Sequence, residues 1–224
     1  MSLQQPALPP FVIFEGVDGA GKTALARLLA EYYRTAAPDD ELYFDNFPGS
    51  IPGTLGEWVY RAHHGLAVDS PRPEDMAGPA LQLLHVAAHV DTILNRITPM
   101  LQRGGRVILD RYWWSTYAYS RRMLAPDKVW SIVGAERAFW RDLPAPRALY
   151  IKRNQSLKSD EIDSATHREI DDYYAEVVAY EVANGVEVHQ VRNDGTLNDA
   201  FQAVLAALRL PPTVVAQPSL GTTE

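Results

Sequence analysis

The stretch FVIFEGVDGAGKT at residues 11–23 joins a short apolar run to a glycine-rich loop. From Gly16 onward it fits the phosphate-binding pattern G-x-x-x-x-G-K-[ST] at every fixed position. Backbone amides can surround a phosphate only where side chains leave room, and Gly16, Gly19 and Gly21 leave that room. The stretch therefore predicts a loop that binds the phosphates of a nucleotide.

The end of the loop predicts how ATP and Mg²⁺ would be held. A helix that begins near Gly21 adds its positive N-terminal dipole, Lys22 reaches the β- and γ-phosphates, and the Thr23 hydroxyl ligates magnesium. The alternative is a chance glycine-rich turn, but the helical run ALARLLAEYY follows at residues 24–33. This context favours an ATP site. The predicted ATP-binding residues are Gly16, Gly19, Ala20, Gly21, Lys22 and Thr23.

Composition narrows the class of protein. With 224 residues, 46% of them hydrophobic, the chain can bury one substantial core. Its net charge of -7 argues against a general nucleic-acid binder, and the lack of cysteine excludes disulfides and thiolate metal sites. No apolar run approaches the roughly 20 residues of a membrane helix, and the N-terminus lacks signal-peptide features. We expect a cytoplasmic protein with small-molecule partners, neither nucleic acid nor membrane.

Short apolar runs alternate with helical patterns along the chain. Buried strands are predicted at residues 11–16, 42–47, 106–110, 148–152 and 186–191. Helices are predicted at residues 22–34, 74–102, 112–123, 163–183 and 197–208. This alternation predicts an α/β fold, a three-layer P-loop NTPase architecture with a five-stranded parallel sheet flanked by helices.

The predicted domain is single and covers residues 11–210. Residues 1–10 and 211–224 are polar or proline-rich without periodicity. We expect both to be flexible segments outside the packed core.

Asp110, Arg111 and Tyr112 come directly after the third predicted strand. There, Asp110 would hold the magnesium shell or polarise the attacking oxygen, and Arg111 would bind a phosphoryl group in a bidentate manner. An ordinary surface ion pair is the alternative. The phosphate-binding loop favours the functional interpretation.

Four segments in order resemble the thymidylate kinase family of nucleoside monophosphate kinases. They are FVIFEGVDGAGKT at the start, FPGS and LGE within residues 47–57, LLHVAAH at 83–89 and DRYWWSTYAY at 110–119. The resemblance implies transfer of the γ-phosphoryl of magnesium-bound ATP to a deoxynucleoside monophosphate, usually dTMP. Such a reaction needs positioning and charge neutralisation more than covalent chemistry.

The resemblance also assigns roles to single residues. Lys22, Arg111 and Asp18 become the catalytic group, with Asp18 accepting a hydrogen bond from the sugar 3′-hydroxyl of the acceptor. Asp18 as a solvated loop carboxylate is the alternative. The implied acceptor contacts are Asp18, Phe47, Arg61, His85, His89, Arg111, Tyr112 and Tyr119.

The chain departs from the family where the acceptor is bound. His85 stands where a phenylalanine commonly stacks on thymine, and His89 where an arginine reads the base. An imidazole ring can stack on a base and donate a hydrogen bond, but it lacks the paired N–H donors of the arginine guanidinium. Recognition of the base would therefore be altered. Alternatively, both histidines only line an apolar helix. Tyr60 stands where the family carries an arginine that binds the phosphate of the acceptor, and Arg61 follows one position later.

The segment after the fourth strand is shorter than the arginine-containing lid of relatives. Arg153, Lys158 and Arg168 are the lid candidates, with a solvated charged loop as the alternative. After the fifth strand, Arg192 would stack on adenine, or the Asn-Asp-Gly sequence that follows it forms a simple turn.

Three functions remain open from the sequence. The first is a dTMP kinase-like enzyme, the second a P-loop kinase for a nucleoside or other small acceptor, and the third a nucleotide-binding regulatory protein with little catalysis. The family also forms homodimers. The Trp113-Trp114 pair and the face of the 74–102 helix are candidate dimer surfaces, although core packing explains them as well.

Overall fold

The computed structural model of the chain describes residues 7–49, 51–64, 66, 76–158, 160 and 162–213. Five strands form one parallel sheet in the order β2-β3-β1-β4-β5. The strands are β1 (Phe11–Glu15), β2 (Leu42–Asn46), β3 (Arg106–Asp110), β4 (Arg147–Lys152) and β5 (Val188–Arg192). The predicted α/β fold with a five-stranded parallel sheet is confirmed.

The helices lie between these strands in the chain. They are α1 (Lys22–Ala36), α2 (Leu55–His63), α3 (Gly78–Thr92), the π-helical turn η2 (Ile93–Ile97), α4 (Thr98–Gln102), α5 (Trp113–Ser120), α6 (Pro126–Trp140), α7 (Ser164–Ala183) and α8 (Leu197–Ala207).

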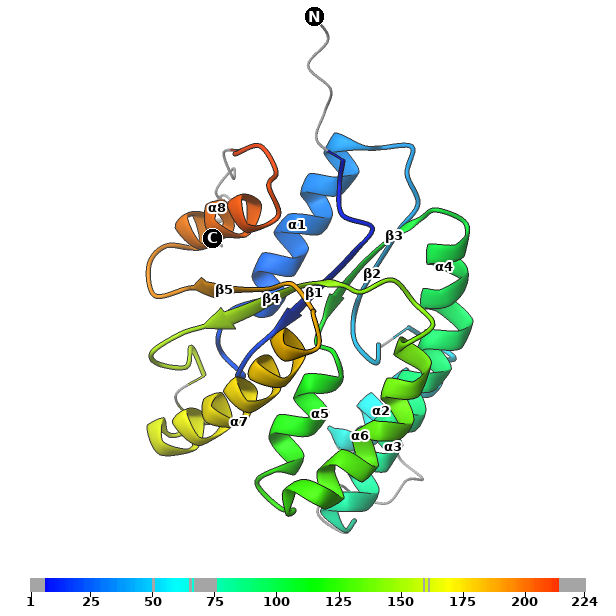
Figure 1. Ribbon diagram of the computed structural model, residues 1–224, viewed down its shortest axis with the longest axis vertical. Helices are drawn as coiled ribbons and strands as arrows, with labels where there is room; N and C mark the ends of the chain where they lie inside the picture. The colour runs from blue at the N-terminus through cyan, green and yellow to red at the C-terminus, as the bar shows by residue number, and fades with distance from the viewer. Residues whose placement is uncertain are drawn as a thin grey trace, which may run out of the picture.

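Helices cover both faces of the sheet, as Figure 1 shows. Phe11 and Ile13 of β1 join a hydrophobic core that includes residues of α5, α6 and α7. Val12 and Phe14 point to the other face and join a core with α1 and α8. Because both faces are buried, the strand is apolar from Phe11 to Phe14, and this explains why a continuous apolar run predicted it.

The helix predicted over residues 74–102 is divided in the structure. Residues 74 and 75 lie outside the described residues, and the described helix begins at Gly78. The π-helical turn η2 follows α3, where the amide of Thr98 donates to the carbonyl oxygen of Ile93. Pro99 has no amide hydrogen and crowds the carbonyl one turn earlier, which explains the wider turn at this place.

Helices α2 and α6 are absent from the list of helices predicted above. Helix α6 carries the expected signals, since Pro126 opens its first turn and Val129, Val133 and Trp140 are buried along one face. Gly134 in its middle weakens the propensity and hides the pattern. For α2 the signal was the Thr54 cap, whose hydroxyl accepts from the amide of Glu57 at 3.1 Å.

Chain before the expected start of the domain at residue 11 packs against it. Leu8 is buried, and its carbonyl oxygen accepts a hydrogen bond from Arg106 at 2.6 Å. Residues 8–10 therefore pack on the domain, although the sequence places them in a flexible segment. Residues 1–6 and 214–224, the greater part of the two expected flexible segments, lie outside the described residues.

Two further observations bear on partners. Trp113 and Trp114 are fully buried in the core, so they are not available as a dimer surface. Among the described residues, no helix is both long and apolar enough to cross a membrane.

Candidate active site

The site lies where β1 and β3 end side by side at the carboxyl edge of the sheet. Phe14 of β1 is paired with Asp110 of β3, and the amide of Arg111 donates to the carbonyl oxygen of Phe14 at 2.9 Å. Two segments far apart in the sequence thus become neighbours. Ligands of open parallel sheets bind at this edge.

The glycine-rich loop closes around the ammonium group of Lys22. This residue is the first of α1, and its Nζ donates to the carbonyl oxygens of Gly16 at 2.8 Å and Val17 at 3.0 Å. Burial lowers the pKa of Lys22, and the positive charge of Arg111 acts in the same direction. A buried cation that is destabilised in this way attracts an anion.

The N-cap of α1 requires a glycine. Gly21 has a φ of 95°, and a Cβ on it would lie 2.2 Å from Nδ2 of Asn193. The same amide group donates to the carbonyl oxygen of Ala20 at 2.8 Å. The end of β5 therefore holds the loop in a conformation that a larger residue would not adopt.

Thr23 and Asp110 form the oxygen pair that was predicted to serve magnesium. The Thr23 hydroxyl donates to Oδ2 of Asp110. The other carboxylate oxygen, Oδ1, is buried and has no hydrogen-bond partner in the described part of the chain. Carboxylate and hydroxyl oxygens are hard ligands that suit Mg²⁺, so these two side chains fit the ion.

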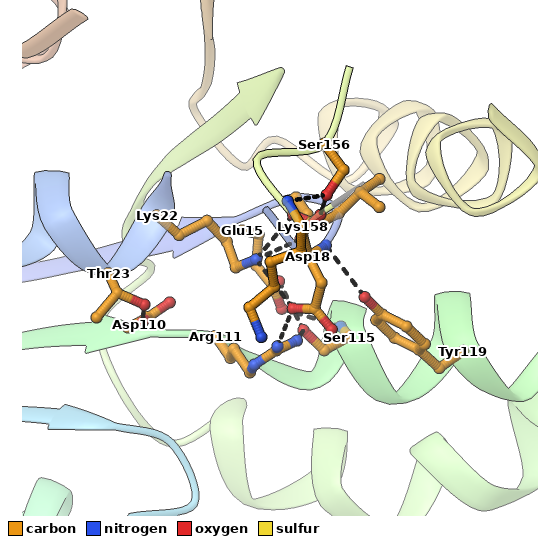
Figure 2. Close-up of polar contacts among 12 residues, drawn as sticks. Glu15, Asp18, Lys22, Thr23, Asp110, Arg111, Ser115, Tyr119, Ser156 and Lys158 are labelled. Atoms are coloured by element: carbon orange, nitrogen blue, oxygen red, sulfur yellow. Dashed lines mark hydrogen bonds and ion pairs between the residues drawn. The ribbon is translucent and has the colours of Figure 1, made fainter. Parts of the chain in front are cut away.

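Asp18 joins the loop to Arg111, as Figure 2 shows. Its Oδ1 accepts a hydrogen bond from Nη2 of Arg111 and lies 3.7 Å from Nζ of Lys22. Its amide donates to the hydroxyl of Tyr119 at 3.2 Å. Burial raises the pKa of Asp18, but the charges of Arg111 and Lys22 outweigh this effect and hold it well below its usual range. Asp18 is therefore ionised and fixed between two cations.

Arg111 has an unusual backbone for a residue with a side chain. Its φ is 85°, in the left-handed region. Nη1 donates to the hydroxyl of Ser115 at 3.3 Å, and the guanidinium lies 5.9 Å from the centre of the Tyr119 ring. Strained backbones of this kind cluster at functional sites, where surrounding contacts compensate for their cost.

Glu15 is a component of the site that the sequence did not single out. Its Oε1 accepts from the amides of Tyr112 at 2.7 Å and Ser115 at 2.9 Å, at the start of α5. Its Oε2 accepts from the hydroxyls of Ser115 at 2.8 Å and Tyr174 at 3.1 Å. Glu15 thus caps α5 from another element and orients the segment that carries Arg111. Its position at the end of a buried strand, directly before Gly16, was the available signal.

The loop after β4 lies directly on the phosphate-binding loop (Figure 2). Ser156 donates through its hydroxyl to the carbonyl oxygen of Asp18 at 2.9 Å, and the amide of Leu157 donates to that of Gly19 at 3.0 Å. Lys158, a lid candidate, belongs to this loop. Arg168 is exposed on α7.

The other lid candidate, Arg153, has a different neighbour. Its Nη1 donates to the carbonyl oxygen of Asn193. Arg192, predicted at the adenine, is mainly exposed, and its Nη1 lies 3.2 Å from Oδ1 of Asn154 and 3.5 Å from Oδ2 of Asp194. The loops after β4 and β5 are therefore tied to each other.

Phe47 and His89 face each other inside the protein. Their rings stack with centroids 4.1 Å apart, and both side chains are buried. Nδ1 of His89 lies 2.7 Å from Oε2 of Glu136, a fully buried residue of α6. Phe47, expected to wall the acceptor pocket, and His89, expected at the base-reading position, are thus packed on each other, and their contact with the acceptor stays a prediction.

His85 and Arg61 lie nearer the surface. The His85 ring is half-buried and meets His63 edge-on, with centroids 5.3 Å apart. Arg61 is exposed; its Nη1 lies 3.8 Å from Oε1 of Glu57, and Nη2 donates to the carbonyl oxygen of Leu66 at 3.4 Å. The structure therefore ties Arg61 to its own helix, while His63 lies next to His85.

Tyr112 differs from the expected acceptor contact. Its ring is buried and packs on Trp140, with centroids 4.6 Å apart. As the N-cap of α5 it turns its amide to Glu15 and its side chain into the core. Of the two predicted tyrosines, Tyr119 is the one that contacts Asp18.

A family profile described as Thymidylate kinase matches residues 14–135, more than half of the chain. The chain belongs to the thymidylate kinase family. The matched part runs from β1 into α6 and includes the glycine-rich loop, Asp110 and Arg111. The family predicted from the sequence is confirmed, and with it the class, a phosphotransferase of the nucleoside monophosphate kinase type.

Individual relatives support this assignment. The thymidylate kinase of Thermomicrobium roseum is 38% identical over 122 residues, which cover 54% of this chain and 52% of that protein, about half its length. The thymidylate kinase of Gluconobacter oxydans is 29% identical over 215 residues, 91% of this chain and 96% of that protein. A crystal structure of thymidylate kinase from Ehrlichia chaffeensis has the same fold, with a TM-score of 0.68 at 20% identity over 88% of this chain and 97% of that one.

Proposed function

We propose that this member of the thymidylate kinase family transfers the γ-phosphoryl group of ATP to dTMP. The observation that carries the proposal is the convergence of Lys22, Asp18 and Arg111 at a phosphate-binding loop. The relatives named above, all thymidylate kinases, support dTMP as the acceptor.

ATP and Mg²⁺ are the proposed cofactors. The positive φ angles of the loop glycines would let backbone amides turn towards phosphate oxygens, and the buried Oδ1 of Asp110 lacks a partner within the described residues. Thr23 and Asp110 would hold the ion, which when bound neutralises charge on the phosphates. The pair between Thr23 and Asp110 would open to admit it.

Lys22 and Arg111 would provide the positive charge that the transferred group needs. Lys22 exchanges its bonds to the loop carbonyls for phosphate oxygens, and Arg111 binds the phosphoryl group with its planar fork. Asp18, fixed between them, positions the guanidinium and accepts a hydrogen bond from the acceptor sugar. Because little covalent chemistry is required of the protein, these charges and their geometry account for the catalysis.

The test is ADP release by the purified protein with MgATP and a panel of dNMPs, NMPs and nucleosides. We expect turnover selective for dTMP, and a loss of about 10²–10³ in kcat for Lys22→Ala, since one main electrostatic group is removed. Lys128→Ala, an exposed lysine on α6, is the matched control and should behave as wild type.

The other outcomes identify the alternatives. Selective turnover of a nucleoside would make the chain a P-loop kinase for another small acceptor. Tight ATP binding without acceptor-dependent ADP would indicate a regulatory nucleotide-binding protein. The contact of Arg153 with the carbonyl oxygen of Asn193 motivates this second candidate, because a lid arginine that keeps this bond has less of its guanidinium available for the transferred phosphoryl group.

A homodimer is also proposed. Leu83 on α3 and Leu94 on η2 are exposed hydrophobic residues of the helical face expected to form an interface. Light scattering of the wild type beside Leu83→Glu tests this, and a monomer in both cases would contradict it. The single domain at residues 11–210, the cytoplasmic location and the contact of Arg192 with adenine stay predictions.

A further inference from the structure

Four of the six histidines of the chain lie in one row. The row reaches the candidate active site through His89, which stacks on Phe47, and the amide of Phe47 donates to the carbonyl oxygen of Asp110 at 2.9 Å. Helix α2 packs against α3 (Figure 1). His64 and His63 at the end of α2 have ring centroids 5.2 Å apart, His63 and His85 are 5.3 Å apart, and His85 and His89 are 6.4 Å apart. His63 and His64 are exposed, His85 is half-buried and His89 is buried. The row therefore runs from the surface towards the core.

The groups around His63 are mostly cationic or able to become so. His64 lies beside it on α2 and His85 faces it from α3, while the charges of Arg111 and Asp18 also act on its ring. Asp18 is already bound to Arg111. On α2 itself, Arg61 and Glu57 face each other at 3.8 Å.

These surroundings disfavour a proton on either imidazole. Loss of hydration lowers the pKa of His63, and His64 and Arg111 lower it further, against the weaker effect of Asp18. Burial, with His89 and His63, lowers the pKa of His85 to about 3. Both rings are therefore neutral at neutral pH. Among the described residues, Asp18 is the anion that acts on His63, and its charge is already balanced by Arg111.

A phosphate dianion beside Arg111 would change this balance. Its negative charge favours the protonated form of a nearby imidazole by the same Coulombic effect that now acts against it. His63 is the candidate to take the proton because it is exposed, whereas His85 is half-buried and its pKa is lowered to about 3. His85 would stay neutral and support the ring of His63 edge-on.

We propose that His63 binds the phosphate of the acceptor in its protonated form, next to Arg111, so that acceptor binding takes up a proton. The inference rests on the proposed function, since it assumes that a nucleoside monophosphate occupies the acceptor side. It adds His63 to the substrate-binding residues and makes acceptor affinity dependent on pH.

The direction of the pH effect follows from linkage. If the bound form has the higher pKa, affinity is greatest below that pKa and falls as pH rises through it, by at most about tenfold per pH unit for one proton. The phosphate group itself has a second pKa of about 6, so it is mainly dianionic above pH 7. The interval from pH 7.0 to 8.5 therefore isolates the protein group.

Calorimetric titration without ATP measures this directly. We expect the Kd of dTMP to rise about fivefold or more from pH 7.0 to 8.5, with proton uptake seen as a dependence of the heat on the buffer. Thymidine, which lacks the phosphate, should show neither effect. His63→Gln should remove the pH dependence and the proton uptake, whereas His189→Gln on β5, next to Glu187, should retain both.

The outcomes separate this inference from the proposed function. An equal pH dependence in His63→Gln, or the same dependence for thymidine, would overturn the role of His63 even if dTMP is a good substrate. NMR titration of the His63 ring with inorganic phosphate covers the case in which dTMP does not bind. A raised His63 pKa in phosphate would then support the anion site and contradict only the acceptor, whereas an unchanged pKa would overturn the site.

Discussion

The proposed donor and acceptor sides of the site are built in different ways. The donor side consists of the loop at residues 16–23, whose shape depends on positive φ angles and on backbone carbonyls that bind Lys22. The proposed acceptor side consists of side chains from several elements, such as His89 of α3 and its partner Glu136 of α6, which are 47 residues apart in the sequence. The first is a local conformation and the second is a product of packing.

The difference teaches which mutations should act on which substrate. A local backbone motif is sensitive to the residue at each of its own positions and tolerant of distant changes. A packed pocket depends on partners outside it, so a buried change on a neighbouring helix can alter it. Substitutions on each side should therefore separate the kinetic constants of ATP from those of the acceptor.

The largest effect is expected at Arg111, where the two sides meet. Arg111→Lys keeps the charge but loses the planar fork that contacts Asp18 and Ser115 together, so we expect kcat to fall by about 10³. Steady-state kinetics with both substrates measures this. Arg34→Lys, an exposed residue paired with Glu31, is the control. Retention of a third or more of the kcat would mean that a point charge suffices at this position.

A smaller effect is expected from a pair of glycines with similar backbones. Gly19 has a φ of 77° and Gly104 a φ of 83°, so this backbone conformation alone costs alanine about 1–2 kcal/mol of unfolding free energy at either position. At Gly19, steric overlap with the loop after β4 adds to this cost. At Gly19 the added Cβ would lie 2.0 Å from the Ser156 hydroxyl, whereas Gly104 has open space. Gly19→Ala should therefore also reduce kcat/KM, by about 10²-fold through misplacement of the two loops.

The two glycine variants are compared by thermal melting and by kinetics. A larger loss of stability in Gly19→Ala, with a loss of activity in that variant alone, would show that the glycine-rich loop needs its close contact with the segment after β4. Equal activity of the two variants would contradict that requirement.

The sequence predicted the glycine-rich loop and the helix after it because their determinants are local. The pattern from Gly16 to Thr23 specifies a backbone shape, and the apolar runs around it specified the parallel sheet. Asp110 and Arg111 could be placed for the same reason, since the carboxyl ends of β1 and β3 meet at one edge of the sheet.

The acceptor side was predicted less well because its determinants are not local. The stacking of Phe47 on His89 depends on Glu136, which lies on α6, a helix hidden by Gly134. Tyr112 was expected at the acceptor, yet as N-cap of α5 it turns into the core. Glu15 was missed because its role depends on amides brought to it by the fold.

The smallest of the three effects is expected at Glu136, and it tests the comparison from the acceptor side. Its two carboxylate oxygens bind Nδ1 of His89 at 2.7 Å and Nε1 of Trp140 at 2.9 Å. Glu136→Gln keeps the shape but removes one acceptor oxygen and the charge, so one buried partner loses its bond, at about 1–3 kcal/mol of unfolding free energy. Because His89 then shifts against Phe47, we expect the KM of the acceptor to rise by up to about tenfold while the KM of ATP stays unchanged.

Glu181→Gln, a buried glutamate on α7, is the matched control for loss of stability without a change in either KM. An equal rise in both KM values for Glu136→Gln would show that the core transmits the change to the loop as well, and the two sides would then form one cooperative unit.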